Sequence, residues 1–206
     1  MKTLLNTTVK SSLAAIILLA ALFTFNTAAA FAAGAANHVF KTPIKKVVVT
    51  GNTRVLIVQS SIEMVKMDEL DLDKVSVKQI GGTLTVHSAE INPITVYVYV
   101  NDIYRIQASG DASVRISGKF TVKNLQVMLS DHASARIRAY TESLYTTVSD
   151  HAKLQLLGNS NTHDYKMAGL AKMDTNKFAS LKSQDITTPE DITASLKKIQ
   201  LATIKK

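Results

Sequence analysis

The 206-residue chain contains no cysteine, and this absence excludes several classes of protein at once. A disulfide scaffold, a thiolate metal site, a cysteine nucleophile and a lipid-acylated cysteine all need a residue that the chain lacks. Tryptophan is also absent, and proline occurs only 3 times. Hydrophobic residues make up 46% of the chain and charged residues 19%, which is typical of a globular protein. The composition identifies no reaction.

Residues 1–32 have the pattern of a secretory signal peptide. Lys2 and Lys10 give a basic start, and residues 13–25 form an apolar run. Ala30-Phe31-Ala32 then places small residues at the two positions that a signal peptidase requires. We therefore expect cleavage after Ala32 and export, to the periplasm or the cell surface of a Gram-negative bacterium.

An uncleaved anchor is the alternative to a signal peptide, because residues 13–36 are nearly long enough to span a bilayer. No later stretch is apolar enough to cross as a helix, so we expect no membrane span after cleavage. We expect residues 33–41 to form a linker and residues 42–206 to form a single domain. Loss of the two signal-peptide lysines lowers the formal net charge from +8 to +6.

The first half of this domain has the alternation of hydrophobic and polar residues that is typical of half-buried strands. The alternating segments are residues 46–50, 54–59, 75–79, 83–87 and 95–101. Residues 62–72 have mixed apolar spacing, and either a short helix or irregular structure fits them. Tyr97 and Tyr99 share one face of a strand, and we expect that face to be core. Little else in the chain has a helical pattern.

The second half of the domain contains an internal repeat. Four segments align with offsets of 21, 19 and 19 residues: 104–116, 125–137, 144–156 and 163–175. A period near 20 residues is typical of one coil of a β-solenoid. We therefore expect an all-β fold in which coils of about 20 residues stack on one another, with residues 178–206 as a degenerate C-terminal coil or cap.

Alternate residues of the repeat form apolar columns, which we expect to face a shared interior because strand residues alternate between faces. The columns are Tyr104/Leu125/Leu144/His163, Ile106/Val127/Thr146/Tyr165, Ala108/Leu129/Val148/Met167, Val114/Ala135/Leu154/Met173 and Ile116/Ile137/Leu156/Thr175. A small residue recurs after each turn, at Ala112, Ala133, Ala152 and Ala171.

Tight turns separate the two strands of each repeat. The turns are Ser109-Gly110-Asp111, Ser130-Asp131-His132, Ser149-Asp150-His151 and Ala168-Gly169-Leu170. Glycine and aspartate tolerate left-handed backbone angles, and serine and aspartate can bond the amides of the turn.

Three stretches resemble a known family: Val47–Gln59, Gly81–Val86 and Val96–Val114, together with the repeated turns. The family is described as putative auto-transporter adhesin, head GIN domain, and the resemblance covers about residues 40–175. It implies a right-handed β-helix in which two sheets meet at the tight Ser-Gly/Asp turns. It also implies an exported bacterial protein of a type common in the Bacteroidetes, and a role in adhesion. It implies no catalytic residues.

The duplicated Ser-Asp-His-Ala is a candidate for chemistry. In register, Asp131 would lie near Asp150 and His132 near His151, and two carboxylates with two imidazoles could bind a divalent ion such as zinc. The simpler explanation is that aspartate fits the turn and histidine is solvated beside it. We favour this explanation and expect no metal and no other cofactor.

The sequence gives even less support to catalytic functions for these turns. Ser130, Asp131 and His132 are consecutive, so they cannot easily align as nucleophile, base and orienting group. Turn aspartates could pair for glycoside cleavage, but no aromatic cleft lining accompanies them.

A basic stripe follows the outer face of the repeats, at Arg115, Arg136, Lys153 and Lys172. It could contact a surface glycan or another anionic polymer, or lipid head groups. Alternatively, it is a solvated face whose charges oppose aggregation. We do not expect nucleic acid as a partner, because the chain is exported and has few interleaved aromatics.

We therefore expect an exported, non-catalytic protein that acts in adhesion or surface binding. Two alternatives stay open: a carbohydrate-active enzyme, and a structural module that forms homo-oligomers because coil ends can stack.

Overall fold

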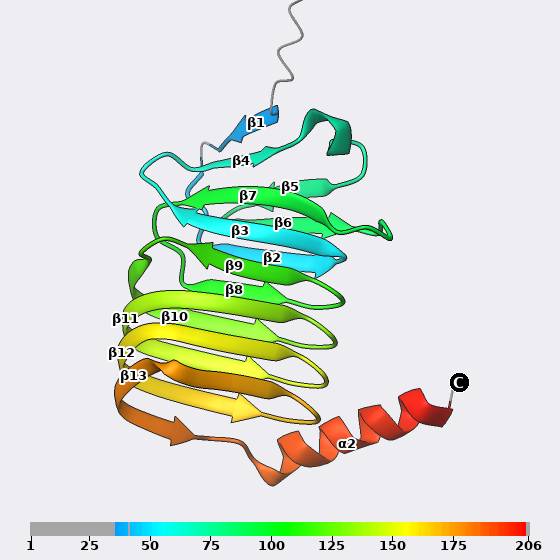
Figure 1. Ribbon diagram of the computed structural model, residues 1–206, viewed down its shortest axis with the longest axis vertical. Helices are drawn as coiled ribbons and strands as arrows, with labels where there is room; N and C mark the ends of the chain where they lie inside the picture. The colour runs from blue at the N-terminus through cyan, green and yellow to red at the C-terminus, as the bar shows by residue number, and fades with distance from the viewer. Residues whose placement is uncertain (1–35, 41, 205–206) are drawn as a thin grey trace, which may run out of the picture. The chain divides into compact units, whose positions relative to one another are not determined.

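The computed structural model describes residues 36–40 and 42–204, and most of them lie in β-strands (Figure 1). The all-β class expected from the sequence is confirmed. The expected signal peptide, residues 1–32, lies outside the described residues, so its cleavage stays a prediction. Within the described ranges, no helix is long and apolar enough to cross a membrane.

The strands of the described chain join into one 13-stranded sheet. They are β1 (Ala36–Val39), β2 (Lys46–Gly51), β3 (Thr53–Gln59), β4 (Met64–Met67), β5 (Ser76–Ile80), β6 (Thr83–Ser88), β7 (Ile94–Val100), β8 (Arg105–Ala108), β9 (Ser113–Ser117), β10 (Thr121–Leu129), β11 (Ser134–Val148), β12 (Lys153–Met167) and β13 (Lys172–Asp185). Strand β1 falls in the segment expected as a linker and pairs antiparallel with β4.

The sheet is curled, so that two arms face each other across the core. The first arm contains β5, β6, β2, β8, β10 and the second halves of the long strands β11, β12 and β13. The second arm contains β1, β4, β7, β3, β9 and the first halves of the same long strands. The long strands bend from one arm into the other along one side of the domain, and tight turns connect the arms along the opposite side (Figure 1).

The four aligned sequence segments lie side by side in parallel pairs. Arg105 pairs with Gln126, Leu125 pairs with Leu144, and Leu144 pairs with His163. These pairs reproduce the sequence offsets of 21, 19 and 19 residues. The backbone also adopts left-handed angles where the turns require them, with φ of 58° at Asp131 and 61° at Asp150.

The strands that precede the repeats are not stacked in chain order. In the first arm β2 lies between β6 and β8, and in the second arm β3 lies between β7 and β9. The chain therefore places β6 and β7 on one side of the β2–β3 pair and then returns to its other side with β8 and β9. No sequence pattern indicated this strand order. The order decides which side chains of the first half lie beside the repeats in the sheet.

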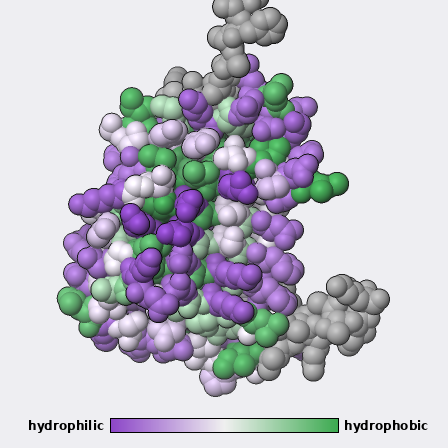
Figure 2. Space-filling view, viewed as in Figure 1, coloured by the Kyte–Doolittle hydropathy of each residue, from purple (hydrophilic) through white to green (hydrophobic). Residues whose placement is uncertain are grey.

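The core lies between the arms and is made by most members of the predicted columns. Thr175, expected in an inner column, is exposed, because the β12–β13 register shifts next to it, between Gln155 and Leu157. Ile106, Val127 and Thr146 are completely buried, as are the turn alanines Ala133 and Ala152. The opposite faces of the strands are outside, and hydrophilic side chains cover much of the molecular face shown in Figure 2. The small turn alanines allow the two arms to approach closely at the corner.

Two expectations about tyrosines are wrong. Tyr104 is 46% exposed, because β8 begins only at Arg105 and the fully buried Ile103 fills the core instead. The Tyr104 ring lies 5.6 Å from the Arg105 guanidinium. Tyr97 faces outward at 40% exposure, since the valines that alternate with it on β7 occupy the core face.

The C-terminal expectation is also wrong in part. Residues 178–185 continue β13 as an extra strand segment, but the alternation over residues 196–204 lies in the helix α2 (Pro189–Ile204). The earlier ambiguous segment, residues 62–72, forms strand β4 followed by the 3₁₀ helix η1 (Glu69–Asp71).

Local capping explains why α2 starts where it does. The Thr188 amide donates to the Asp191 carboxylate at 3.0 Å, and the Asp191 amide donates to the Thr188 hydroxyl at 3.3 Å. Pro189 is the first helical residue, where its missing amide hydrogen costs nothing. Lys166 also donates to Asp191 at 2.9 Å, and this hydrogen bond is the main reason that the pKa of Asp191 falls to about 2.

His163 occupies an inner column, next to the position that Leu144 holds in the preceding repeat, and is only 2% exposed. Its Nε2 lies 3.0 Å from the Thr146 hydroxyl, and its ring lies edge-on to Phe178. Burial lowers the pKa of His163 below its ordinary value of 6.5, against an opposing effect of the Asp164 charge.

We therefore expect His163 to make the fold acid-sensitive. The unfolded chain binds a proton at the ordinary histidine pKa of 6.5 while the folded chain resists it, so stability is lost as the pH falls below that value. In His163→Leu, the difference in melting temperature between pH 7.5 and pH 5.5 should be smaller than in the wild type. An unchanged difference would contradict this role of His163.

Candidate functional site

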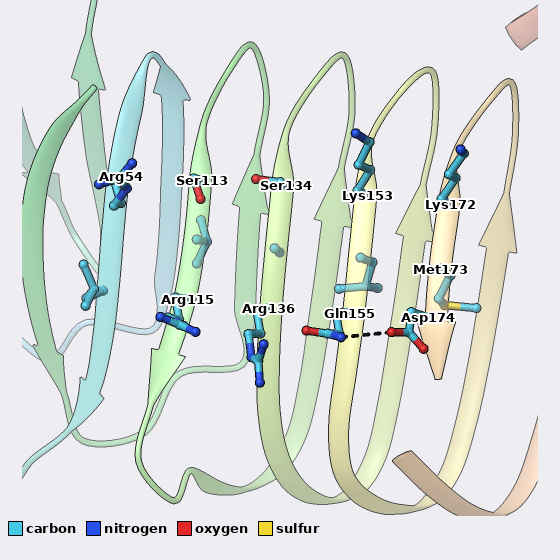
Figure 3. A pocket seen from close by; sticks show the side chains of 14 residues that line it. Arg54, Ser113, Arg115, Ser134, Arg136, Lys153, Gln155, Lys172, Met173 and Asp174 are labelled. Carbon is cyan, nitrogen blue, oxygen red and sulfur yellow. Dashed lines mark hydrogen bonds between the residues drawn. The ribbon is translucent and has the colours of Figure 1, made fainter. Parts of the chain in front are cut away.

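A groove of about 560 Å³ crosses the outer face of the second arm (Figure 3). It runs over β3, β9, β11, β12 and β13, which are consecutive in this arm. Because strand neighbours pair in register, the outward side chains that line it form two parallel rows. The first row is Arg54, Ser113, Ser134, Lys153 and Lys172, and the second row is Leu56, Arg115, Arg136, Gln155 and Asp174.

Within each row, positively charged side chains lie directly beside each other on neighbouring strands. Arg115 pairs with Arg136, and Lys153 pairs with Lys172. Like charges at paired positions of neighbouring strands are destabilising. In the part of the chain that the structure describes, neither these four residues nor Arg54 makes an ion pair. The groove therefore carries concentrated positive charge that a bound anion would neutralise.

An acidic residue marks one end of the second row. Asp174 accepts a hydrogen bond from the Gln155 side chain at 2.9 Å (Figure 3). The Asn176 amide, which donates to Asp174 at 3.0 Å, is the main reason that the pKa of this carboxyl is lowered. Asp174 thus stays ionised, and the positive region is limited to the part of the groove over β3, β9 and β11 and the two lysines beyond.

All four cations of the basic stripe predicted from the repeats line this groove: Arg115, Arg136, Lys153 and Lys172. Arg54 and Leu56 were missed. Alternation along β3 could have placed both on an outer face, since Val55 and Ile57 are completely buried. Only the insertion of the β2–β3 pair beside β9 shows that they belong to the same surface as the repeats.

The Ser-Asp-His corners lie at the turn side of the domain. His132 and His151 come two residues before Ser134 and Lys153 of the first row, but the corner residues themselves do not line the groove. The His132 and His151 rings stack with centroids 5.1 Å apart. The Asp131 carboxylate accepts from the Gly110 amide at 3.1 Å, and the Asp150 carboxylate accepts from the Asp131 amide at 3.2 Å. Each aspartate thereby ties its turn to the preceding one.

The corner was the candidate metal site. Across the described residues, no group of three or more histidine, cysteine, aspartate or glutamate side chains is positioned to hold a metal ion. The hydrogen bonds of Asp131 and Asp150 instead give these carboxylates a role inside the turns.

Asp150→Ala is expected to lower the free energy of unfolding by about 2–3 kcal/mol. The change removes hydrogen bonds from the Asp131 amide and the Ser149 hydroxyl, and it leaves alanine at a φ of 61°. Asp150→Gly should recover about 1 kcal/mol of this loss, because glycine adopts that angle freely. Urea unfolding measures each value. The exposed turn residue Asp111 provides the control, and Asp111→Ala should cost under about 0.5 kcal/mol.

The fold and the groove together define an all-β protein with a basic surface groove. The model of the family described as putative auto-transporter adhesin, head GIN domain, matches residues 43–187. The chain belongs to this family, as the sequence resemblance indicated. Among curated proteins, none matches the chain.

Solved structures with a similar fold include proteins of Bacteroides fragilis and Parabacteroides distasonis. A protein of Bacteroides fragilis described as a putative adhesin has a TM-score of 0.59 at 12% identity, covering 75% of this chain and 78% of its own. A Parabacteroides distasonis protein described as a putative lipid binding protein has a TM-score of 0.55 at 12% identity, covering 74% and 78%. At this identity the likeness shows a shared fold.

Proposed function

We propose that this protein is an exported, non-catalytic binding module of the adhesin type that binds an anionic surface polymer along the basic groove. One observation carries the proposal: five cations from five neighbouring strand segments line a single groove and make no ion pair within the described chain. Family membership and the signal-peptide pattern support export and a role at the cell surface.

We also propose that the repeated part of the fold is a right-handed β-helix with coils of about 20 residues. The parallel pairing of β8, β10, β11, β12 and β13 at offsets near this length supports it. In such a fold each coil adds one outward side chain to each row. A groove built in this way suits a linear ligand that crosses the strands and meets a charge at every step.

A polymer fits the groove better than an isolated small anion does. The cations extend over β3, β9, β11, β12 and β13, and adjacent strands lie about 4.8 Å apart, so the positive region is about 20 Å long. Arginine and lysine at the surface hold anions by screened charge attraction. Binding should therefore weaken steeply as salt is added.

The test is equilibrium binding of the exported, processed protein to a panel of polysaccharides. Polygalacturonate and heparin should bind at low salt and be released by 0.5 M NaCl, and neutral dextran should not bind. Equal retention on dextran, or no binding to any anionic polymer, would overturn the proposal. Release of reducing ends from a bound polymer would show an enzyme instead.

Anionic phospholipid vesicles form an informative comparison, because one structural relative is described as a lipid-binding protein. The groove is lined by arginine, lysine and serine along its first row, and such a surface favours a solvated polymer over acyl chains. Binding to vesicles without binding to polysaccharide would count against the proposal.

A further inference from the structure

We propose that the groove is specific for sugars that carry a compact tetrahedral oxyanion, an ester sulfate or phosphate, and that this group sits over Ser113 and Ser134. The inference rests on the proposed function and names the substrate class of the same groove. Three features support it: the serine floor, the arrangement of cations around the floor, and a tyrosine beside the groove.

The floor consists of two small side chains with available hydroxyls. Ser113 and Ser134 are paired neighbours on β9 and β11, half-buried, and both line the groove. Their hydroxyls make no hydrogen bond to any described residue of the chain, whereas the hydroxyls of the turn residues Ser130 and Ser149 do. Because neighbouring strands lie about 4.8 Å apart, both hydroxyls can donate to oxygens of one anionic group between them.

Cations surround this floor on three sides. Arg54 and Lys153 flank the serines in the first row, and Arg115 and Arg136 lie beside them in the second row. In Figure 3 the labelled serines lie between Arg54 and Lys153, with the two arginines further along the same strands. The serines thus leave a gap in a row that is otherwise basic.

The number of donor groups and their placement on three sides of the serine floor favour a tetrahedral group over a carboxylate. An ester sulfate or phosphate presents three terminal oxygens that point in different directions, and a carboxylate presents two oxygens in one plane. The two hydroxyls lie between Arg54 and Lys153 in their own row, and two guanidinium groups lie beside them in the second row. Guanidinium groups also match such oxyanions with paired hydrogen bonds.

A tyrosine at one end of the groove offers a surface for the sugar itself. Tyr97 is 40% exposed and pairs with Leu56, which lines the groove. Tyr97, Leu56, Arg115 and Arg136 therefore follow one another in a single row across four strands. An aromatic ring that is apolar on its face and partly solvated suits contact with a sugar ring.

Dextran sulfate, dextran phosphate and carboxymethyl dextran of equal substitution share one backbone and test the inference. The wild-type protein should bind at least one of the two tetrahedral esters about 10-fold more tightly than carboxymethyl dextran, and comparison of the two esters shows which anion is preferred. In Ser113→Ala/Ser134→Ala this preference should fall to about 2-fold, because binding of the ester should weaken much more than binding of carboxymethyl dextran. Ser117→Ala, on the same strand but outside the groove lining, is the control.

Tyr97→Ala should weaken binding of the preferred ester about 3- to 10-fold. The exposed Tyr104, which does not line the groove, provides the matched control. Equal wild-type affinity for all three polymers, or an ester preference that survives in the double serine variant, would overturn the inference and leave the proposed function standing. Failure of all three polymers to bind would overturn the proposed function itself.

Discussion

Replacing both Arg115 and Arg136 by glutamate is expected to reduce affinity for an anionic polysaccharide at least 100-fold at low salt. The two guanidinium groups are neighbours in one row of the groove, so an anion that crosses the strands contacts both. Each hydrogen bond to a charged group is worth about 1.5–3 kcal/mol, and every 1.4 kcal/mol corresponds to about a 10-fold change in affinity. Charge reversal adds repulsion to this loss.

The matched control reverses two lysines that lie outside the groove lining. Lys78 and Lys182 are exposed on strands β5 and β13, and Lys78→Glu/Lys182→Glu changes the net charge by the same amount. When both double variants are compared at about 0.1 M salt, the affinity of this control should fall less than about 3-fold, because exposed charges more than about 10 Å from the ligand are then largely screened. Equal losses in the two double variants would mean that overall charge, and not the groove, governs binding.

The single variant Arg115→Glu separates binding from folding. It converts a repulsive Arg115–Arg136 pair into an attractive one, so the free energy of unfolding should rise by about 0.2–1 kcal/mol while binding weakens. A destabilised Arg115→Glu protein would indicate that the two arginines do not repel each other in the unliganded groove.

Gly158→Ala is expected to lower the free energy of unfolding more than either Asp150→Ala or Gly118→Ala. Gly158 lies on β12 with a φ of 102°, and an added Cβ would come within 2.1 Å of the Ala139 carbonyl oxygen on the neighbouring strand. That oxygen belongs to the backbone, so it cannot move aside without disturbing the β11–β12 pairing. We expect a loss of about 3 kcal/mol or more in the free energy of unfolding, which corresponds to a fall of about 6 °C or more in melting temperature.

Gly118→Ala separates the loss of stability caused by the close contact from the loss caused by the backbone angle. Gly118 has a similar φ of 82°, but nothing lies within 4 Å of the added Cβ. This variant should lose only the strain of a left-handed alanine, about 1–2 kcal/mol. Thermal unfolding of both variants measures the two losses of stability. Equal losses would show that the contact between the added Cβ and the Ala139 carbonyl oxygen does not destabilise Gly158→Ala.

The repeat made much of the second half of the fold predictable from the sequence. A period of 19–21 residues fixes which residues become neighbours once each repeat pairs with the next, so most of the buried columns and the outward side of Arg115, Arg136, Lys153 and Lys172 could be predicted. The columns failed at Tyr104 and Thr175, near the two ends of the repeated segment. The left-handed backbone at Asp131 and Asp150 was equally predictable, because few residues other than glycine, asparagine and aspartate tolerate it in a tight turn.

Local signals that were present in the sequence were misread at two places. In residues 95–101 valines alternate with tyrosines, and the alternation alone does not say which set faces the core. The valines are buried because their compact β-branched side chains pack well between strands, and Tyr97 and Tyr99 face outward. At the C-terminus, Thr188, Pro189 and Asp191 form a helix start that outweighs the apparent alternation further on.

The sequence by itself determined the all-β class, the repeat register, the turn chemistry and the four repeat cations of the groove, because each follows from residues at a fixed spacing along the chain. The tertiary structure alone decided that β2 and β3 lie between strands that follow them, and so brought Arg54 and Leu56 beside Ser113 and Arg115. Pairing between strands distant in sequence depends on how the whole sheet closes over its core, and no local pattern encodes it.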